Sequence, residues 1–170
     1  SSLLPAVEYE KFRAESLTEI CRFLYNTAKK YDYIHPIMID GTSAMILVDD
    51  LTLRNCDEFE TAYVPDIYGA TFYPKSWGKN CKDTPWTLSM YFSIPAGAAR
   101  KAHKLYFVNE LQTHTQSVLT PGSEVSCEEL VSWTLMCIFT GLSGMQLWRW
   151  RPFLHGYQAT GRGLTLMDGT

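Results

Sequence analysis

Two short stretches near the end of the chain carry residues whose types could do chemistry. The first, KLYFVNELQ, is an apolar run that ends in a carboxylate, Glu110, beside an amide, Asn109. The second, GMQLWRWRP, ends in aromatic and guanidinium side chains, among them Trp148, Arg149 and Trp150. An apolar run that opens into polar residues is typical of a buried parallel strand whose carboxyl end delivers side chains into a site. A carboxylate among aromatic platforms and hydrogen-bonding groups points to sugar chemistry more often than to any other kind.

Strands and helices alternate along the sequence, which predicts how such residues are positioned. Apolar runs predict strands at residues 35–40, 67–73, 105–110 and 145–150. Helical spacing of apolar residues predicts helices at 15–31, 86–103 and 127–140, with a less regular helical region at 47–63. Alternation of this kind is typical of an α/β fold in which helices cover a parallel sheet.

Local sequence signals support two of these predicted helices and argue against an unbroken third. The helix at 15–31 has an apolar face made of Leu17, Ile20, Cys21, Leu24 and Ala28, which we expect to face the core. Ser126, followed three residues later by Glu129, predicts a capping box at the start of the helix at 127–140. Pro95 and Gly97 should break or kink the helix at 86–103.

Composition limits the class of protein. The 170 residues are 46% hydrophobic and 14% aromatic, which suits a single region, 1–170, with a proper core. A net charge of −3 without a basic run argues against a nucleic-acid partner. The five cysteines have no metal-site spacing, so we expect no metal and a reducing compartment such as the cytoplasm. We expect neither a signal peptide nor a membrane span, because the sequence shows no leader pattern and no apolar run of membrane-spanning length.

From His35 to the end, the chain resembles the second half of the (β/α)8 barrel of clan A glycoside hydrolases, and within that clan the family 42 β-galactosidases. Four strand-end signatures carry the resemblance, in barrel order: His35-Pro36, the aromatic TFYP that ends in Tyr73-Pro74, NELQ, and GMQLWRWRP followed by GYQATGRGLTLMDG. The resemblance implies strands five to eight of a TIM barrel with their helices.

The resemblance also implies a retaining exo-glycosidase, similar to β-galactosidases, that uses no cofactor. Glu110 takes the place of the nucleophile, Tyr73 that of a tyrosine that contacts it, and Trp148 that of an aromatic lining the sugar subsite. An Asn-Glu pair marks the acid/base on the fourth strand more often, but only one strand follows Glu110, so the nucleophile is the better assignment. The other residues that we expect to bind substrate are Trp150, Arg149, Gln158, Asn109, Gln112 and Asp40.

The sequence departs from the family pattern at three positions. Gln158 and Gly161 stand where family 42 carries a Glu and a His that hold galactose, and Val118 stands where it carries a Trp. Gln158 can still hydrogen-bond a hydroxyl. These changes put galactose specificity in doubt more than glycosidase chemistry, and an arabinopyranoside, fucoside or mannoside substrate stays open.

The acid/base belongs on the fourth strand, which we expect upstream of Ser1 in the remaining half of the barrel, and we expect the parent protein to be a homo-oligomer. Asp40 matches a family Asn and is interpreted as a loop-capping or ligand-positioning residue. His114 and His155 are expected to be solvated loop residues. Two alternatives stay open: a non-catalytic carbohydrate-binding or scaffold fragment, and a different, metal-dependent barrel enzyme, which no ligand cluster supports.

Overall fold

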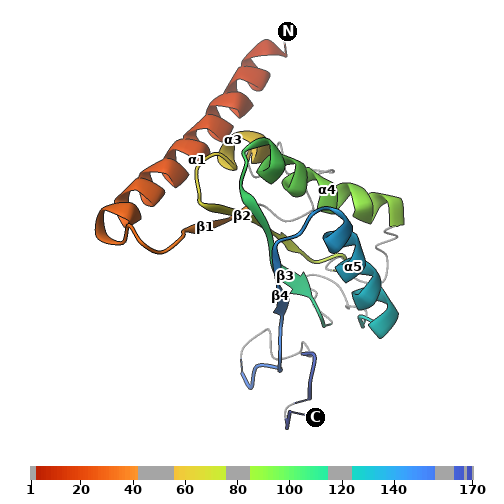
Figure 1. Ribbon diagram of the computed structural model, residues 1–170. Coiled ribbons are helices and arrows are strands. Elements are labelled where there is room, and N and C mark those ends of the chain that lie inside the picture. The colour runs from red at the N-terminus through yellow and green to blue at the C-terminus, as the bar shows by residue number, and fades with distance from the viewer. Residues whose placement is uncertain are drawn as a thin grey trace.

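The computed structural model describes residues 3–41, 56–75, 85–114, 124–155, 163–166 and 168–169. Its centre is a four-stranded sheet in the order β1-β2-β3-β4, in which every neighbouring pair is parallel (Figure 1). The strands are β1 (Met38–Gly41), β2 (Ile67–Phe72), β3 (Leu105–Gln112) and β4 (Gly144–Trp148). The predicted α/β class is confirmed, with a parallel sheet consistent with half of a TIM barrel.

The helices are α1 (Leu4–Tyr31), α3 (Glu58–Thr61), α4 (Pro85–Lys101) and α5 (Cys127–Phe139). The capping box of α5 is present as predicted, and α4 continues through Pro95 instead of ending there. Helix α1 begins at Leu4 and not at Glu15, because a proline in the first turn loses no hydrogen bond and does not stop the helix. Of the helical region predicted at 47–63, only α3 is helical among described residues, and 42–55 lie outside them.

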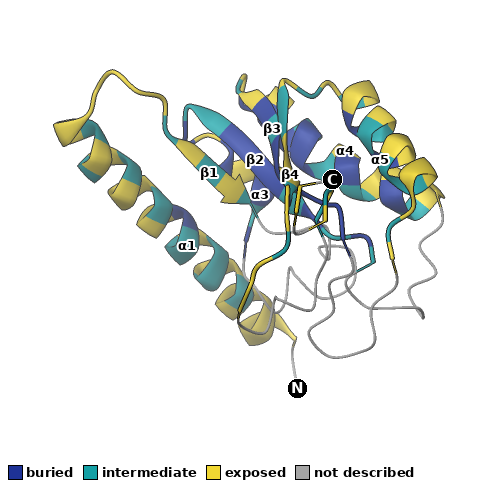
Figure 2. Cartoon of the chain, turned by 90° about the horizontal axis from the view of Figure 1, so that it is seen from below, coloured by how far each residue is buried: buried dark blue, intermediate teal, exposed yellow. Residues whose placement is uncertain are grey.

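The hydrophobic core lies between one face of the sheet and helices α4 and α5 (Figure 2). Strand β2 contributes alternate residues, Tyr68, Ala70 and Phe72, which are all fully buried. Phe92 of α4 packs edge-on against Phe72, with the ring centroids 4.4 Å apart. Alternation along β2 therefore directs the side chain of Thr71 to the other face of the sheet.

A β-bulge interrupts this alternation in β3. Ala70 of β2 pairs with Val108, whereas the next residue, Thr71, pairs with Glu110. Asn109 is therefore the extra residue. Val108 and Leu111 are both buried in the core although three positions separate them. The bulge thus lets Asn109 and Glu110, which are consecutive, both reach partners away from the core.

The side chain of Asn109 in β3 passes over Gly69 of β2 and reaches Asp40 of β1. Its Nδ2 donates to Asp40 Oδ1 at 3.1 Å, so the contact joins β3 to β1 across β2. A Cβ atom at Gly69 would lie 2.5 Å from Asn109 Cγ and closer still to its amide nitrogen. The absence of a side chain at position 69 is what leaves room for this contact.

The packing of α1 differs from the prediction. Ile20 and Leu24, expected in the core, are exposed, and Thr18 is the buried residue of the helix. The packed side makes polar contacts instead: Thr18 Oγ1 lies 3.1 Å from Thr61 Oγ1, and Lys29 Nζ lies 2.7 Å from an Asp66 carboxylate oxygen. The apolar spacing predicted the helix correctly, but the side chains Ile20 and Leu24 that it placed in the core are exposed.

Gly69→Ala should destabilise the fold, because the new methyl group must displace the Asn109 side chain or the backbone of β2. We expect a loss of about 1–3 kcal/mol in the free energy of unfolding, measured by urea denaturation. Gly97→Ala in α4 is the matched control, since its Cβ would meet Phe59 at an ordinary 3.9 Å. In an Asn109→Ala background, Gly69→Ala should cost clearly less; an equal cost in both backgrounds would contradict this account.

Candidate active site at the carboxyl ends of the strands

Tyr73 and Glu110 meet where β2 and β3 end. Tyr73 follows the last residue of β2 directly, and Glu110 lies near the end of β3, after the bulge. The Tyr73 hydroxyl donates to Glu110 Oε2 at 2.5 Å. Burial, and then the hydrogen bond to Glu110, raise the pKa of Tyr73 far above its usual value. The phenol therefore keeps its proton and acts as a hydrogen-bond donor to the carboxylate throughout the physiological pH range.

Asp40 forms a second polar group on the same side of the sheet. Its Oδ2 accepts from Thr71 Oγ1 at 2.6 Å and its Oδ1 accepts from Asn109 Nδ2. Desolvation by the surrounding protein raises the pKa of Asp40, and the hydrogen bonds from Thr71 and Asn109 act in the opposite direction. Asn109 Oδ1 is buried and has no hydrogen-bond partner among the described residues.

The end of β4 carries an aromatic and guanidinium cluster. The Trp148 ring packs edge-on against Phe153, with centroids 6.1 Å apart, and the Arg149 guanidinium lies over the same Phe153 ring at 3.8 Å from its centroid. The peptide bond between Trp148 and Arg149 is cis. Arg149 is buried, whereas Trp150 is 64% exposed.

Polar contacts hold the ends of β3 and β4 together. The Trp148 carbonyl accepts from Thr113 N at 3.0 Å and from His114 Nδ1 at 2.9 Å. A carbonyl can only accept, so Nδ1 of His114 carries the hydrogen in this bond. The expectation that His114 is solvated is wrong, because it is only 3% exposed. The chain after β3 packs against the end of β4, where Thr113 and His114 both bond to the Trp148 carbonyl. His155 is exposed, as expected.

Gln112 is fully buried and bonds to the protein at both ends of its amide. Its Oε1 accepts from Lys75 N at 2.8 Å, and its Nε2 donates to His114 O at 2.9 Å. Gln112 therefore joins the chain after β2 to the chain after β3, and a substrate contact for it stays a prediction. Gln158, the remaining predicted contact, lies outside the described residues.

Sequence reasoning missed two members of the strand-end groups. Thr71 lies two residues before Tyr73, and in a strand this spacing places both on one face, so the TFYP motif held the signal for it. Phe153 had no comparable signal, because its role depends on a turn after β4 that brings its ring to Trp148 and Arg149.

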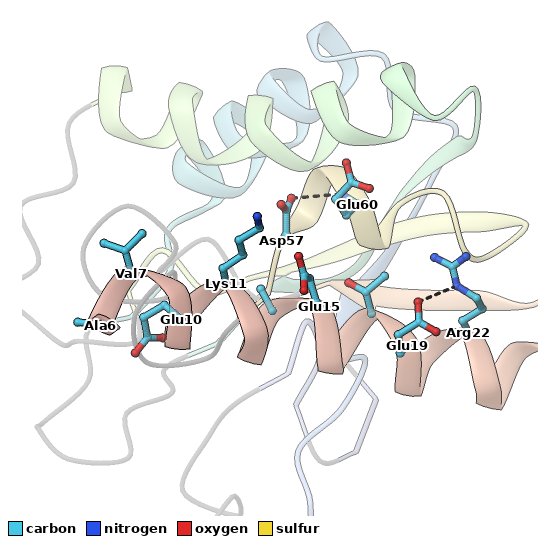
Figure 3. A pocket seen from close by; sticks show the side chains of 11 residues that line it. Ala6, Val7, Glu10, Lys11, Glu15, Glu19, Arg22, Asp57 and Glu60 are labelled. Carbon is cyan, nitrogen blue, oxygen red and sulfur yellow. Dashed lines mark hydrogen bonds and ion pairs between the residues drawn. The ribbon is translucent and has the colours of Figure 1, made fainter. Parts of the chain in front are cut away.

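The described residues form no metal-ligand cluster, and one hollow lies away from the strand ends. Within the described ranges, no group of three or more His, Cys, Asp or Glu residues could hold a metal ion. A hollow of about 920 Å³ lies between α1 and α3 (Figure 3), lined in part by Glu15, Glu19 and Asp57. Asp57 caps α3 there and Glu19 pairs with Arg22, so these two carboxylates already have structural partners. No described helix combines the length and hydropathy needed to cross a bilayer.

The Asp40 carboxyl should titrate above the usual aspartate pKa of 3.8, as measured by NMR of side-chain carboxyl carbons. Asn109→Ala removes a hydrogen bond that favours the charged form, so it should raise the pKa of Asp40 further. Glu8→Ala, at an exposed position of α1, is the control and should leave it unchanged. An Asp40 pKa at or below the ordinary value would show that the hydrogen bonds outweigh desolvation.

Protonation of His114 should destabilise the fold, because burial lowers its pKa in the folded state. The unfolded chain therefore binds this proton more readily than the folded chain. The contribution of neutral His114 to the free energy of unfolding is fully present well above the unfolded pKa of about 6.5, and it is lost as the pH falls through that value. Urea unfolding between about pH 8 and pH 5 should show a smaller loss for His114→Gln than for the wild type. Asn26→Gln, at an exposed position of α1, is the control, and its pH profile should match the wild type.

The fold recurs in known β-galactosidases. The chain is similar to the β-galactosidase of the Antarctic haloarchaeon Halorubrum lacusprofundi, with a TM-score of 0.74, 16% identity, and coverage of 95% of this chain and 24% of that one. It is also similar to the β-galactosidase of the psychrophilic Marinomonas ef1, with a TM-score of 0.74, 12% identity, and coverage of 92% and 24%.

No protein-family model matches the chain, and no characterised protein matches it in sequence. At the identities found, the likeness to solved structures is one of fold. The chain spans about a quarter of the length of the two β-galactosidases that it resembles. The predicted resemblance to part of a glycoside hydrolase barrel is confirmed: the chain has the fold of a partial barrel of the β-galactosidase kind.

Proposed function

We propose that the chain is the nucleophile-bearing half of a retaining exo-glycosidase that removes a terminal, non-reducing sugar, as β-galactosidases do. One observation supports this proposal most directly: the Tyr73 hydroxyl donates to the Glu110 carboxylate at the carboxyl ends of β2 and β3, the end of a barrel where active sites form. The fold likeness to β-galactosidases supports the same proposal.

In the proposed reaction, a Glu110 carboxylate oxygen attacks the anomeric carbon and forms a glycosyl ester. The bond to the leaving oxygen breaks, and a second carboxyl protonates that oxygen. Water then attacks the anomeric carbon and the second carboxyl takes its proton, while the ester bond to Glu110 breaks and releases the free sugar and the Glu110 carboxylate. The role of Tyr73 is to keep the carboxylate oriented, because its own proton stays in place. We assign the second carboxyl to the remaining half of the barrel.

Asp40 is better suited to positioning than to proton donation. Both of its oxygens accept hydrogen bonds from the protein, from Thr71 and Asn109, and a carboxyl in this arrangement has little freedom to approach a leaving group. Trp148, at the end of β4, would offer its ring to the C–H face of the sugar, and the exposed Trp150 would extend that platform. The sugar and the linkage stay open among galactosides, arabinopyranosides, fucosides and mannosides.

In a protein that carries the whole barrel, Glu110→Gln should abolish hydrolysis of aryl glycosides and leave sugar binding largely intact. The amide keeps the shape of the side chain but cannot form the glycosyl ester. The loss in kcat should be at least about 10³-fold, measured by release of the aryl group. Glu8→Gln, which makes the same chemical change at an exposed position of α1, should retain full activity.

Azide separates a nucleophile from an acid/base at position 110. Glu110→Ala leaves space for a small anion, so azide should restore turnover and give a glycosyl azide of inverted configuration. An azide product of retained configuration would instead identify Glu110 as the acid/base. The isolated 170-residue chain should bind sugar without hydrolysing any glycoside. Hydrolysis by that chain would mean that Asp40, or an acid from another chain, donates the proton.

A further inference from the structure

Gln112 is a buried amide that the reaction proposed above does not use. It is the last residue of β3 and is fully buried, and burial of an amide is unfavourable unless its polar atoms are hydrogen-bonded. Its Oε1 accepts from Lys75 N and its Nε2 donates to His114 O. A backbone N–H can only donate and a carbonyl can only accept, so these two partners fix which way the amide points. Gln112 is therefore suited to holding backbone in place.

The bond from Lys75 N to Gln112 restrains the chain just after Tyr73. On its amino side, Tyr73 follows Phe72, the last residue of β2, which pairs with β3. On its carboxyl side, only Pro74 separates Tyr73 from Lys75, and a proline ring fixes the backbone angle φ. The backbone of Tyr73 is thus held by the pairing of β2 with β3 on one side and by the Gln112 amide on the other.

The partner of the Tyr73 phenol comes from the same strand as Gln112. Glu110, whose Oε2 accepts the hydrogen bond from the Tyr73 hydroxyl, also belongs to β3 and lies two residues before Gln112. One strand therefore supplies both the acceptor for the hydroxyl and the restraint on the backbone that carries it. With both attachments on a single strand, the phenol has little freedom to leave the carboxylate.

We propose that Gln112 is a positioning residue for the pair of Tyr73 and Glu110: its amide holds the backbone that follows Tyr73 and so keeps the phenol directed at the carboxylate. This role takes the place of the substrate contact that the sequence suggested for Gln112. It rests on the proposed function, in which a Glu110 oxygen must be aimed at the anomeric carbon. Aim matters for the rate, because a misplacement of about 1 Å can cost about 100-fold.

A second anchor reaches Lys75 through its side chain. Lys75 Nζ donates to Glu124 O at 2.6 Å and to Glu129 Oε2, in the first turn of α5, at 2.7 Å. This anchor acts at the tip of a long, flexible side chain, whereas Gln112 acts on the backbone itself. Lys75→Met removes the side-chain anchor and keeps the backbone N–H, so it should disturb Tyr73 much less than a substitution of Gln112.

The titration of Tyr73 reports its position without any substrate. Its pKa is raised by burial and by the hydrogen bond to Glu110, so a phenol that leaves the carboxylate should have a pKa closer to the usual value of about 10. The nearby charge of Asp40 raises this pKa and that of Arg149 lowers it, and all variants compared here keep both groups. Carbon NMR of the 170-residue chain, labelled at tyrosine, would follow Tyr73, whose signal is the one lost in Tyr73→Phe.

Gln112→Met has a side chain of similar length that cannot bond to Lys75 N or to His114 O, so we expect the pKa of Tyr73 to fall. Thr18→Val, which removes a buried hydrogen bond between α1 and α3, controls for a general loss of stability and should leave the pKa of Tyr73 unchanged. Circular dichroism would check folding. If Gln112→Met does not fold, Gln112→Asn takes its place with the same expectation, because the shorter amide cannot reach both partners.

In a protein that carries the whole barrel, Gln112→Met should lower kcat for aryl glycosides about 10- to 100-fold and change KM little, because positioning acts on the reacting geometry. Loss of a substrate contact would instead raise KM. In a Tyr73→Phe background, Gln112→Met should lower kcat less than about threefold, since the hydroxyl through which Gln112 acts is already absent. Thr18→Val should retain full activity.

Three results would overturn the proposal. The first is a Tyr73 pKa that Gln112→Met leaves unchanged or that Thr18→Val lowers equally. The second is a loss of kcat that is as large in the Tyr73→Phe background as in the wild type. The third is an equal effect of Lys75→Met, which would assign the role to the contact with α5. The titration needs no substrate, so it tests Gln112 even if Glu110→Gln stays active, a result that would contradict only the proposed function.

Discussion

The β-bulge at Asn109 is the constraint on which the candidate site depends. In a regular strand, Asn109 and Glu110 would point to opposite faces of the sheet. With the bulge, Val108 and Leu111 both stay in the core. Asn109 can then hydrogen-bond to Asp40, and Glu110 can accept a hydrogen bond from Tyr73. Strand ends from β1, β2 and β3 are thereby joined through two consecutive side chains of β3. Bulges are often found beside active sites, where they re-aim a side chain in this way.

The two faces of the sheet are stabilised in different ways. Helices α4 and α5 bury residues of β2 and β3 on one face, which supplies hydrophobic stabilisation. On the other face, by contrast, Asp40 is held by hydrogen bonds that Thr71 and Asn109 donate to its two oxygens. In the proposed glycosidase, the remaining half of the barrel would enclose these polar groups.

Electrostatics support the division of roles among the ionisable groups at the strand ends. Tyr73 is held protonated by burial and by its carboxylate neighbour, which raise its pKa, so it can donate a hydrogen bond but cannot serve as a base near neutral pH. The pKa of Asp40 is raised by desolvation, and both of its oxygens accept hydrogen bonds from the protein. Glu110 accepts a hydrogen bond from the Tyr73 phenol, and in the proposed reaction it is the carboxylate that attacks the sugar.

The type and order of the elements, and the residues at their ends, follow from the pattern of apolar and polar residues along the sequence. Buried parallel strands are apolar along their length, so the strands that lead to Tyr73 and Glu110 were predictable, and parallel pairing made their meeting an expected consequence. Tertiary contacts set four other features. These are the register shift at Asn109, the passage of its side chain over Gly69, the burial of His114 and the polar packing of α1. Each depends on which residues of distant segments come into contact, and neither local spacing nor side-chain type encodes that choice.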